Sequence, residues 1–141
     1  MALERNADAS VISLFAGDTG SFVIDGSRES GEAWTENDRM QMTISDGDTI
    51  MLQRWYRLDD QWDLGDGMYL VEFHNEDTDE WPAKTYQMER RYSVNPTWKT
   101  GTAPAGRCAN AMTSGNEMIS GEIVDTVIQG TFTVKPVLGK I

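Results

Sequence analysis

The sequence predicts an all-β domain, a sandwich or a barrel, and three observations lead to this class. Apolar and polar residues alternate along most of the chain, which is the pattern of half-buried strands. Turns that contain Gly or Asp interrupt the pattern at short intervals, as they do in sandwiches and barrels. Evidence for helix is poor throughout. The eight expected strands are residues 10–16, 21–24, 39–44, 49–58, 68–73, 84–94, 122–128 and 131–137.

The first two expected strands lie on either side of a tight turn. Residues 10–16 are mostly β-branched or apolar, and they stop at Gly17 and Asp18. Both residue types favour turns, so the chain is expected to turn there and continue as strand 21–24.

The next pair shows the clearest alternation. In residues 39–44, Met40, Met42 and Ile44 share one face and polar residues occupy the other. An Asp-Gly-Asp turn then leads into residues 49–58. This pair is expected to be a hairpin with one buried face.

The remaining strands are predicted in the same way. An acidic loop at 75–80 joins strand 68–73 to strand 84–94, and a Gln-Gly turn joins strand 122–128 to strand 131–137.

Residues 95–120 lack any strand pattern. Within them, residues 103–118 are rich in Ala but are broken by Pro104, Gly106 and Gly115, so we expect a long loop or arm with at most one helical turn, at residues 108–112. A loop of this length is unusual unless it is functional or is ordered by a neighbouring subunit. The chain has 141 residues, so residues 1–141 are expected to form one domain.

Charge excludes several classes of partner. The chain has 12 basic and 23 acidic residues, a net charge of −11. Nucleic acids and anionic membranes are bound by clustered cations, so neither is an expected partner. The first eight residues lack the apolar core of a signal peptide, and we expect synthesis in a cytoplasm. Cys108 is the single cysteine, so the chain can form neither an intrachain disulfide nor a Cys-based zinc site.

Catalytic residues are scarce. His74 is the single histidine, and no nucleotide, hydrolase or zinc motif occurs. Asn75, Asp77 and Asp79 have the spacing of calcium ligands, but Glu80 stands where a calcium loop needs Gly. We therefore expect a protein that is not an enzyme and has no cofactor or bound metal.

Five tryptophans are many for one small domain. Trp anchors protein interfaces, stacks on sugars, or fills cores, and the loop tryptophans are divided between domain packing and a subunit interface. The candidate interface residues are Trp62, Trp81, Trp98, Arg107, Met112 and Met118.

The order of the strand motifs resembles a known family. Residues 11–24 (VISLFAGDTGSFVI) are similar to the opening of the Ig-like N-terminal domain of phage tail and baseplate proteins, typified by the baseplate upper protein. Residues 31–44 and 64–73 resemble the next two motifs of that family, and residues 126–136 resemble its closing strand. The likeness spans residues 10–137, although residues 95–120 form a longer insertion than the family pattern suggests.

The resemblance implies an antiparallel, Ig-like β-sandwich of about eight strands with one long loop. It implies a virion structural protein of the tail, baseplate or capsid, which is made in the host cytoplasm. Such a protein acts through contacts with other virion proteins and in a homo-oligomer.

Three alternatives remain open. The first is a β-sandwich that binds a carbohydrate or host receptor through its loop tryptophans. The second is a fimbrillin-like adhesin, because residues 27–39 resemble the opening of fimbrillin-like pilins, although the chain has no lipobox cysteine. The weakest is a hydrolase that uses His74 or a pair of carboxylates in a pocket.

Overall fold

The computed structural model describes residues 3–5, 10–25, 34–58, 68–103, 108–110 and 118–136. These residues form strands and one short helix. In chain order the elements are β1 (Glu4–Arg5), β2 (Val11–Phe15), β3 (Gly20–Asp25), β4 (Arg39–Asp46), β5 (Thr49–Arg57), β6 (Met68–Phe73), α1 (Asn75–Thr78), β7 (Lys84–Trp98), β8 (Cys108–Asn110) and β9 (Met118–Lys135).

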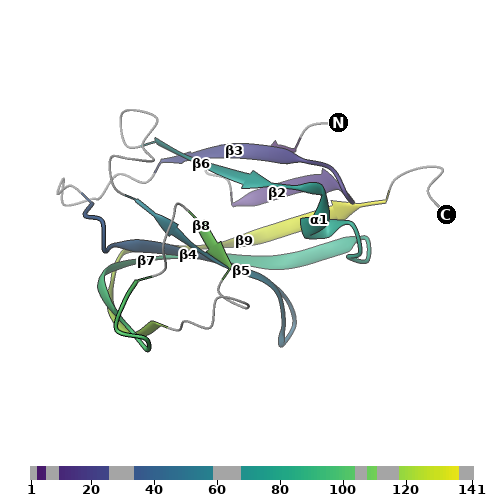
Figure 1. Ribbon diagram of the computed structural model, residues 1–141. Helices are drawn as coiled ribbons and strands as arrows, with labels where there is room; N and C mark the ends of the chain where they lie inside the picture. Colours follow the sequence, from purple (N-terminus) through teal and green to yellow (C-terminus); the bar gives the residue numbers. More distant parts are fainter. Residues whose placement is uncertain are drawn as a thin grey trace.

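The strands form two sheets (Figure 1). The larger has the order β1-β2-β9-β7-β4-β5-β8, and the smaller is the pair β3-β6. The described strands leave the larger sheet open, with β1 and β8 at its edges, so they form no closed barrel. The expectation of a mostly-β fold is confirmed.

One pair of strands departs from the expected antiparallel pattern. β2 and β9 run parallel, with Val11 opposite Thr131 and Phe15 opposite Lys135. They come from opposite ends of the chain, so no tight hairpin turn forces them to be antiparallel. The larger sheet is therefore mixed.

The two sheets pack face to face around a shared apolar core. Figure 1 shows the β3–β6 pair lying over β2 and the adjoining part of β9. Phe73 of β6 contacts Phe132 of β9, with ring centroids 5.0 Å apart, and stacks on Phe22 of β3. At the other end, Trp34 stacks on Tyr92 of β7 at 5.9 Å. Most of the buried apolar residues belong to one continuous cluster, and Trp55 and Trp98 are buried outside it.

The expected turn at residues 129–130 is wrong, because a single strand runs through it. β9 extends from Met118 to Lys135 and pairs with β7 over most of that length. Gly130 lies opposite Met88 within this pairing. The glycine allows the Ser10 backbone to approach β9 closely, because a Cβ at position 130 would lie 1.8 Å from the Ser10 carbonyl oxygen.

The expected long loop at 95–120 is also corrected where the structure describes it. Asn95 to Trp98 continue β7, residues 108–110 form β8, and Met118 begins β9. Register shifts between Val94 and Trp98 accompany this extension. Such irregularities add bend and twist to a strand, and they weaken its sequence pattern. Residues 104–107 and 111–117 lie outside the described residues.

A buried carboxylate anchors the start of β4. Asp38 is 1% exposed and accepts hydrogen bonds from the backbone N–H groups of Thr35 at 2.8 Å and Asn95 at 2.9 Å. Asn95 has a φ of 48°, a left-handed conformation that Asn tolerates better than most residues. Asp38 therefore ties the chain before β4 to the irregular part of β7.

Candidate functional site: a polar groove on the outer sheet face

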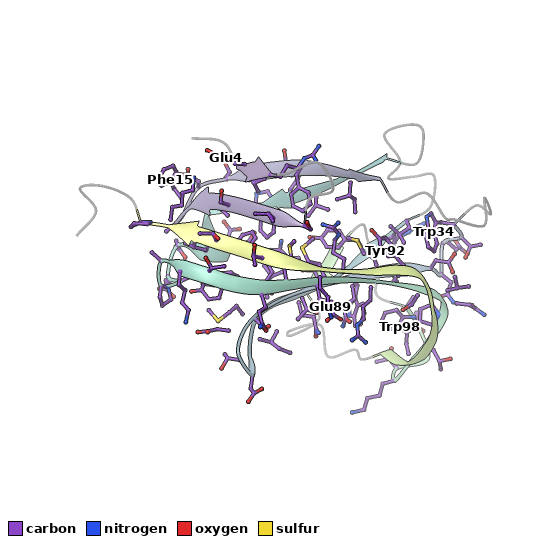
Figure 2. The ribbon with its side chains drawn as sticks, turned by 180° about the vertical axis from the view of Figure 1, so that it is seen from behind. Glu4, Phe15, Trp34, Glu89, Tyr92 and Trp98 are labelled. Carbon is purple, nitrogen blue, oxygen red and sulfur yellow. The ribbon has the colours of Figure 1, made fainter. Side chains whose placement is uncertain are left out.

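The larger sheet has a second face, directed away from β3 and β6, which we call the outer face. On β4 the core-facing Met40, Met42 and Ile44 are buried, whereas Gln41, Thr43 and Ser45 are half-exposed. Figure 2 shows the same division on β7, where Tyr92 points toward the smaller sheet and Glu89 points away from it. The alternation that was used to predict the strands thus also defines this face.

Strand register brings polar residues into rows across the outer face. Thr43 of β4 lies opposite both Gln53 of β5 and Glu89 of β7, and Glu89 lies opposite Gln129 of β9. Neighbouring strands are about 4.8 Å apart, so this row spans roughly 14 Å.

Further polar residues continue the surface on both sides of this row. Ser45 lies opposite Gln87 on one side, and Gln41 lies opposite Arg91 on the other. All of them line one groove with a volume of about 570 Å³. The groove therefore collects amide, hydroxyl and paired charged groups from four strands.

Internal contacts use part of the hydrogen-bonding capacity of the groove. Gln53 Nε2 donates to Thr43 Oγ1 at 3.1 Å, and the Arg91 guanidinium pairs with the Glu89 carboxylate. The side-chain amides of Gln41, Gln87 and Gln129 hydrogen-bond to no other described residue. Each of these amides can donate and accept, so the groove offers both kinds of hydrogen bond to a ligand.

An aromatic pair stands beside the groove. Trp55 of β5 lies opposite Gln41 and packs edge-to-face on Trp98 of β7, with centroids 5.0 Å apart. Both indoles are buried, at 5% and 4% exposed. Their Nε1 donors have no hydrogen-bond partner in the described structure. The pair closes one side of the outer face without offering an open stacking surface.

The six candidate interface residues do not come together in the described part of the chain. Trp98 is buried against Trp55. It therefore takes part in packing within the domain, which is one of the two roles considered for the loop tryptophans. Trp81 is half-exposed and packs on Tyr86 and Phe132. Met118 lies opposite Trp98 at the start of β9. Trp62, Arg107 and Met112 lie outside the described residues.

The acidic stretch at 75–80 contains the short helix α1. The Asp77 carboxylate accepts from the His74 backbone N–H at 2.7 Å and pairs with the Arg54 guanidinium. Thr78 is fully buried and accepts from the Gly17 backbone N–H at 3.2 Å. The contacts of the Asp77 carboxylate therefore attach α1 to the sheets. No group of three or more His, Cys, Asp or Glu in the described residues is arranged to hold a metal ion.

His74 lies at the surface. Its side chain is 57% exposed, and its Nε2 is 3.9 Å from a Glu72 carboxylate oxygen. Neither residue lines the groove. The hydrolase alternative required His74 or two carboxylates in a concave pocket. Among the described residues that line the groove there is one carboxylate, Glu89, and no histidine.

The sequence hypotheses missed the groove because they searched for Trp, His and acids. A usable signal was present, since every second residue of 41–45 and of 87–91 has a polar side chain. The described part of the chain also has no helix with the length and hydropathy of a membrane span.

Comparison of the chain with protein-family models, curated proteins and solved structures finds no match.

Proposed function

We propose that the chain is a structural component of a bacteriophage virion, in the tail, baseplate or capsid, and that it acts through assembly contacts. Its two packed sheets are then a variant of the Ig-like sandwich. Ig domains divide seven to nine strands between two antiparallel sheets. Here most of the strands belong to the larger sheet, and one pair is parallel.

The observation that carries the proposal is the position of the family-like segments in space. The opening segment 11–24 contains β2 and most of β3, the segment 64–73 contains β6, and the closing segment 126–136 contains the end of β9. β2 pairs with β9 and β3 pairs with β6. Motifs separated by a hundred residues therefore meet as neighbouring strands.

These strands also share one core. Ile12 and Leu14 of β2, Phe22 of β3, Val71 of β6 and Phe132 of β9 are all buried in it. Short degenerate motifs occur by chance in many β proteins. Their convergence on one packed unit supports a common structural origin with the family, because the motifs then describe the same two-layer core.

Trp81 is the candidate contact that best fits this proposal among those with a described side chain. It is half-exposed and is fixed by Tyr86 at 5.2 Å and by Phe132 at 6.0 Å. A large aromatic held in place and partly open to solvent is the kind of residue that anchors interfaces.

The experiment has two arms. Mass spectrometry of virions from phages whose tail or head genes adjoin this gene should detect the protein as a stoichiometric component. Sedimentation and negative-stain electron microscopy of the purified protein should show closed rings or small symmetric oligomers. A protein that stays monomeric at high concentration and is absent from virions overturns the proposal.

Charge offers a further discriminating measurement. With a net charge of −11, docking on a basic neighbour should weaken as added salt screens the attraction. Association that does not change with salt would instead identify an apolar interface.

A further inference from the structure

The chemistry of the outer-face groove narrows the kind of ligand that it can hold. Its two described charged residues, Glu89 and Arg91, neutralise one another in an ion pair. The groove therefore offers no excess of positive charge to a phosphate or carboxylate ligand. The net charge of −11 adds a repulsion against polyanions.

The lining is also unsuited to an apolar partner. Its one apolar side chain is Met88, which is 2% exposed and belongs to the core. The centre of a protein interface is normally rich in aromatic and apolar residues, and a membrane surface needs apolar or cationic contacts. Among the described residues the groove has no exposed apolar side chain, and its one cation, Arg91, is paired with Glu89.

What remains is a surface of hydrogen-bonding groups without net charge. Within the part of the chain that the structure describes, no residue hydrogen-bonds to the side-chain amides of Gln41, Gln87 and Gln129, so these amides offer donors and acceptors to a ligand. Ser45 and Thr43 add hydroxyl groups on β4 between them. A polyhydroxylated ligand presents donors and acceptors at close intervals, so it is the chemical class that matches this pattern.

We propose that the outer-face groove is a binding site for a neutral glycan chain, which lies across strands β5, β4, β7 and β9. The row from Gln53 to Gln129 spans roughly 14 Å, enough for a short oligosaccharide. The glycan belongs to a host surface polysaccharide or to a free oligosaccharide, which share this chemistry. The site does not depend on whether the chain is a virion protein.

This site differs from one built on exposed tryptophans. Trp55 adjoins the groove through Gln41 but is 5% exposed, so it cannot stack flat on a sugar ring. Binding rests on hydrogen bonds that replace bonds to water, and each contributes little net free energy. Affinity in the micromolar to millimolar range is therefore expected for one chain.

The test measures binding of the full chain to a panel of oligosaccharides by calorimetry and NMR titration. The panel contains neutral hexamers of glucose in α and β linkage, of mannose and of N-acetylglucosamine, with sulfated and sialylated chains as anionic comparisons. At least one neutral member should bind more tightly than every anionic member, and its NMR shifts should map to β4, β7 and β9.

Variants connect binding to the groove. Gln87→Ala and Gln129→Ala each remove an available amide and should weaken binding about fivefold, as expected for one hydrogen bond. Thr43→Arg fills the centre of the groove and should abolish binding. Thr97→Ala is the matched control, because Thr97 lies on β7 like Gln87 but is exposed outside the groove. This variant should bind like the wild type. Circular dichroism verifies that each variant is folded.

Three results would overturn the inference. They are no binding of any neutral member at millimolar concentration, tighter binding of the anionic chains, or neutral binding that Thr43→Arg leaves intact. The last result would instead indicate a site on the loop tryptophans.

Discussion

Gly130 of β9 lies directly against the backbone of Ser10. A Cβ at position 130 would stand 1.8 Å from the Ser10 carbonyl oxygen, and the N–H of the next residue, Thr131, donates to that same oxygen at 2.8 Å. This contact lies where the parallel pairing of β2 with β9 begins, at Val11 opposite Thr131. The absence of a side chain at 130 therefore allows the first and last strands of the core to meet.

The Gly130→Ala variant should lose about 2–3 kcal/mol of unfolding free energy, because the added methyl group meets backbone and cannot be relieved by a rotamer change. Urea denaturation measures the loss. Gly47→Asn is the control, since Gly47 has a φ of 60° that Asn tolerates and nothing within 4 Å of a Cβ. Equal stability of Gly130→Ala and wild type would contradict the contact.

The same residue shows where sequence prediction failed. A glycine after a polar residue is typical of a turn, and residues 129–130 were assigned one. The close approach of Ser10 is a long-range contact, and no local pattern reveals it. Alternation did identify the core strands, and residues 68–73 were predicted with the bounds of β6. Local pattern therefore identified strands, whereas their partners depended on contacts between distant parts of the chain.

In the candidate site, too, local sequence pattern and long-range strand pairing contribute differently. Residue type alone left Trp98 divided between domain packing and an interface, and the fold packs it against Trp55, where it is buried. The groove, by contrast, depends on register, since Gln53, Thr43, Glu89 and Gln129 align only when four strands are paired. Composition of one segment cannot predict such a row.

The Asp38→Ala variant should be destabilised by about 2–4 kcal/mol. It removes a buried carboxylate that accepts from the Thr35 and Asn95 backbone N–H groups, and hydrogen bonds to charged groups are among the stronger ones. Thermal and urea unfolding measure the effect. The exposed Asp48→Ala, in the β4–β5 turn, should change stability by less than about 0.5 kcal/mol. A similar small change for Asp38→Ala would show that the two N–H groups find other partners.

The ion pair between Arg54 and Asp77 should show measurable coupling. Their side chains are 12% and 11% exposed, so water screens the pair weakly. A double-mutant cycle with Arg54→Met and Asp77→Asn should give a coupling free energy of about 1–3 kcal/mol. The exposed pair Lys84–Asp46, at 43% and 44%, is the matched comparison and should give less than about 1 kcal/mol. Equal couplings would contradict a role for Asp77 in attaching α1.

Truncation to Ala should affect stability differently at Trp81, which precedes β7, and at Trp98, which ends it. Trp98→Ala removes a side chain that is 4% exposed and should cost about 3–5 kcal/mol. Trp81→Ala removes a half-exposed side chain and should cost less, while it weakens self-association if Trp81 is an assembly contact. Unfolding curves and sedimentation separate the two effects. A Trp81→Ala protein with unchanged oligomeric state would remove Trp81 from the interface.

Stability should fall in the alkaline range through Tyr86. Its hydroxyl donates to the Pro82 carbonyl at 2.6 Å, and burial raises the pKa of Tyr86 above its ordinary value. A group whose pKa is higher in the folded state gives stability that is complete below the unfolded pKa, about 10, and is lost as pH rises through the folded pKa. Tyr86→Phe should be less stable than wild type by about 1 kcal/mol at pH 7 and should approach wild-type stability above pH about 10.

The neighbouring Lys84 titrates in the same pH range, so the measurement has to separate its effect from that of Tyr86. A hydrogen bond to Asp46 raises the pKa of Lys84, so Lys84 loses its contribution in the same alkaline range. Both proteins in the comparison retain Lys84 and its hydrogen bond to Asp46, so that part of the Lys84 effect cancels in the difference between wild type and Tyr86→Phe, whereas the electrostatic interaction between Lys84 and Tyr86 stays in the difference. Denaturant curves between pH 7 and 11.5 give that difference at each pH (roughly the range over which tyrosine titrates). A difference that stays constant across this range would mean that the Tyr86 hydroxyl ionises as easily folded as unfolded, which contradicts its burial.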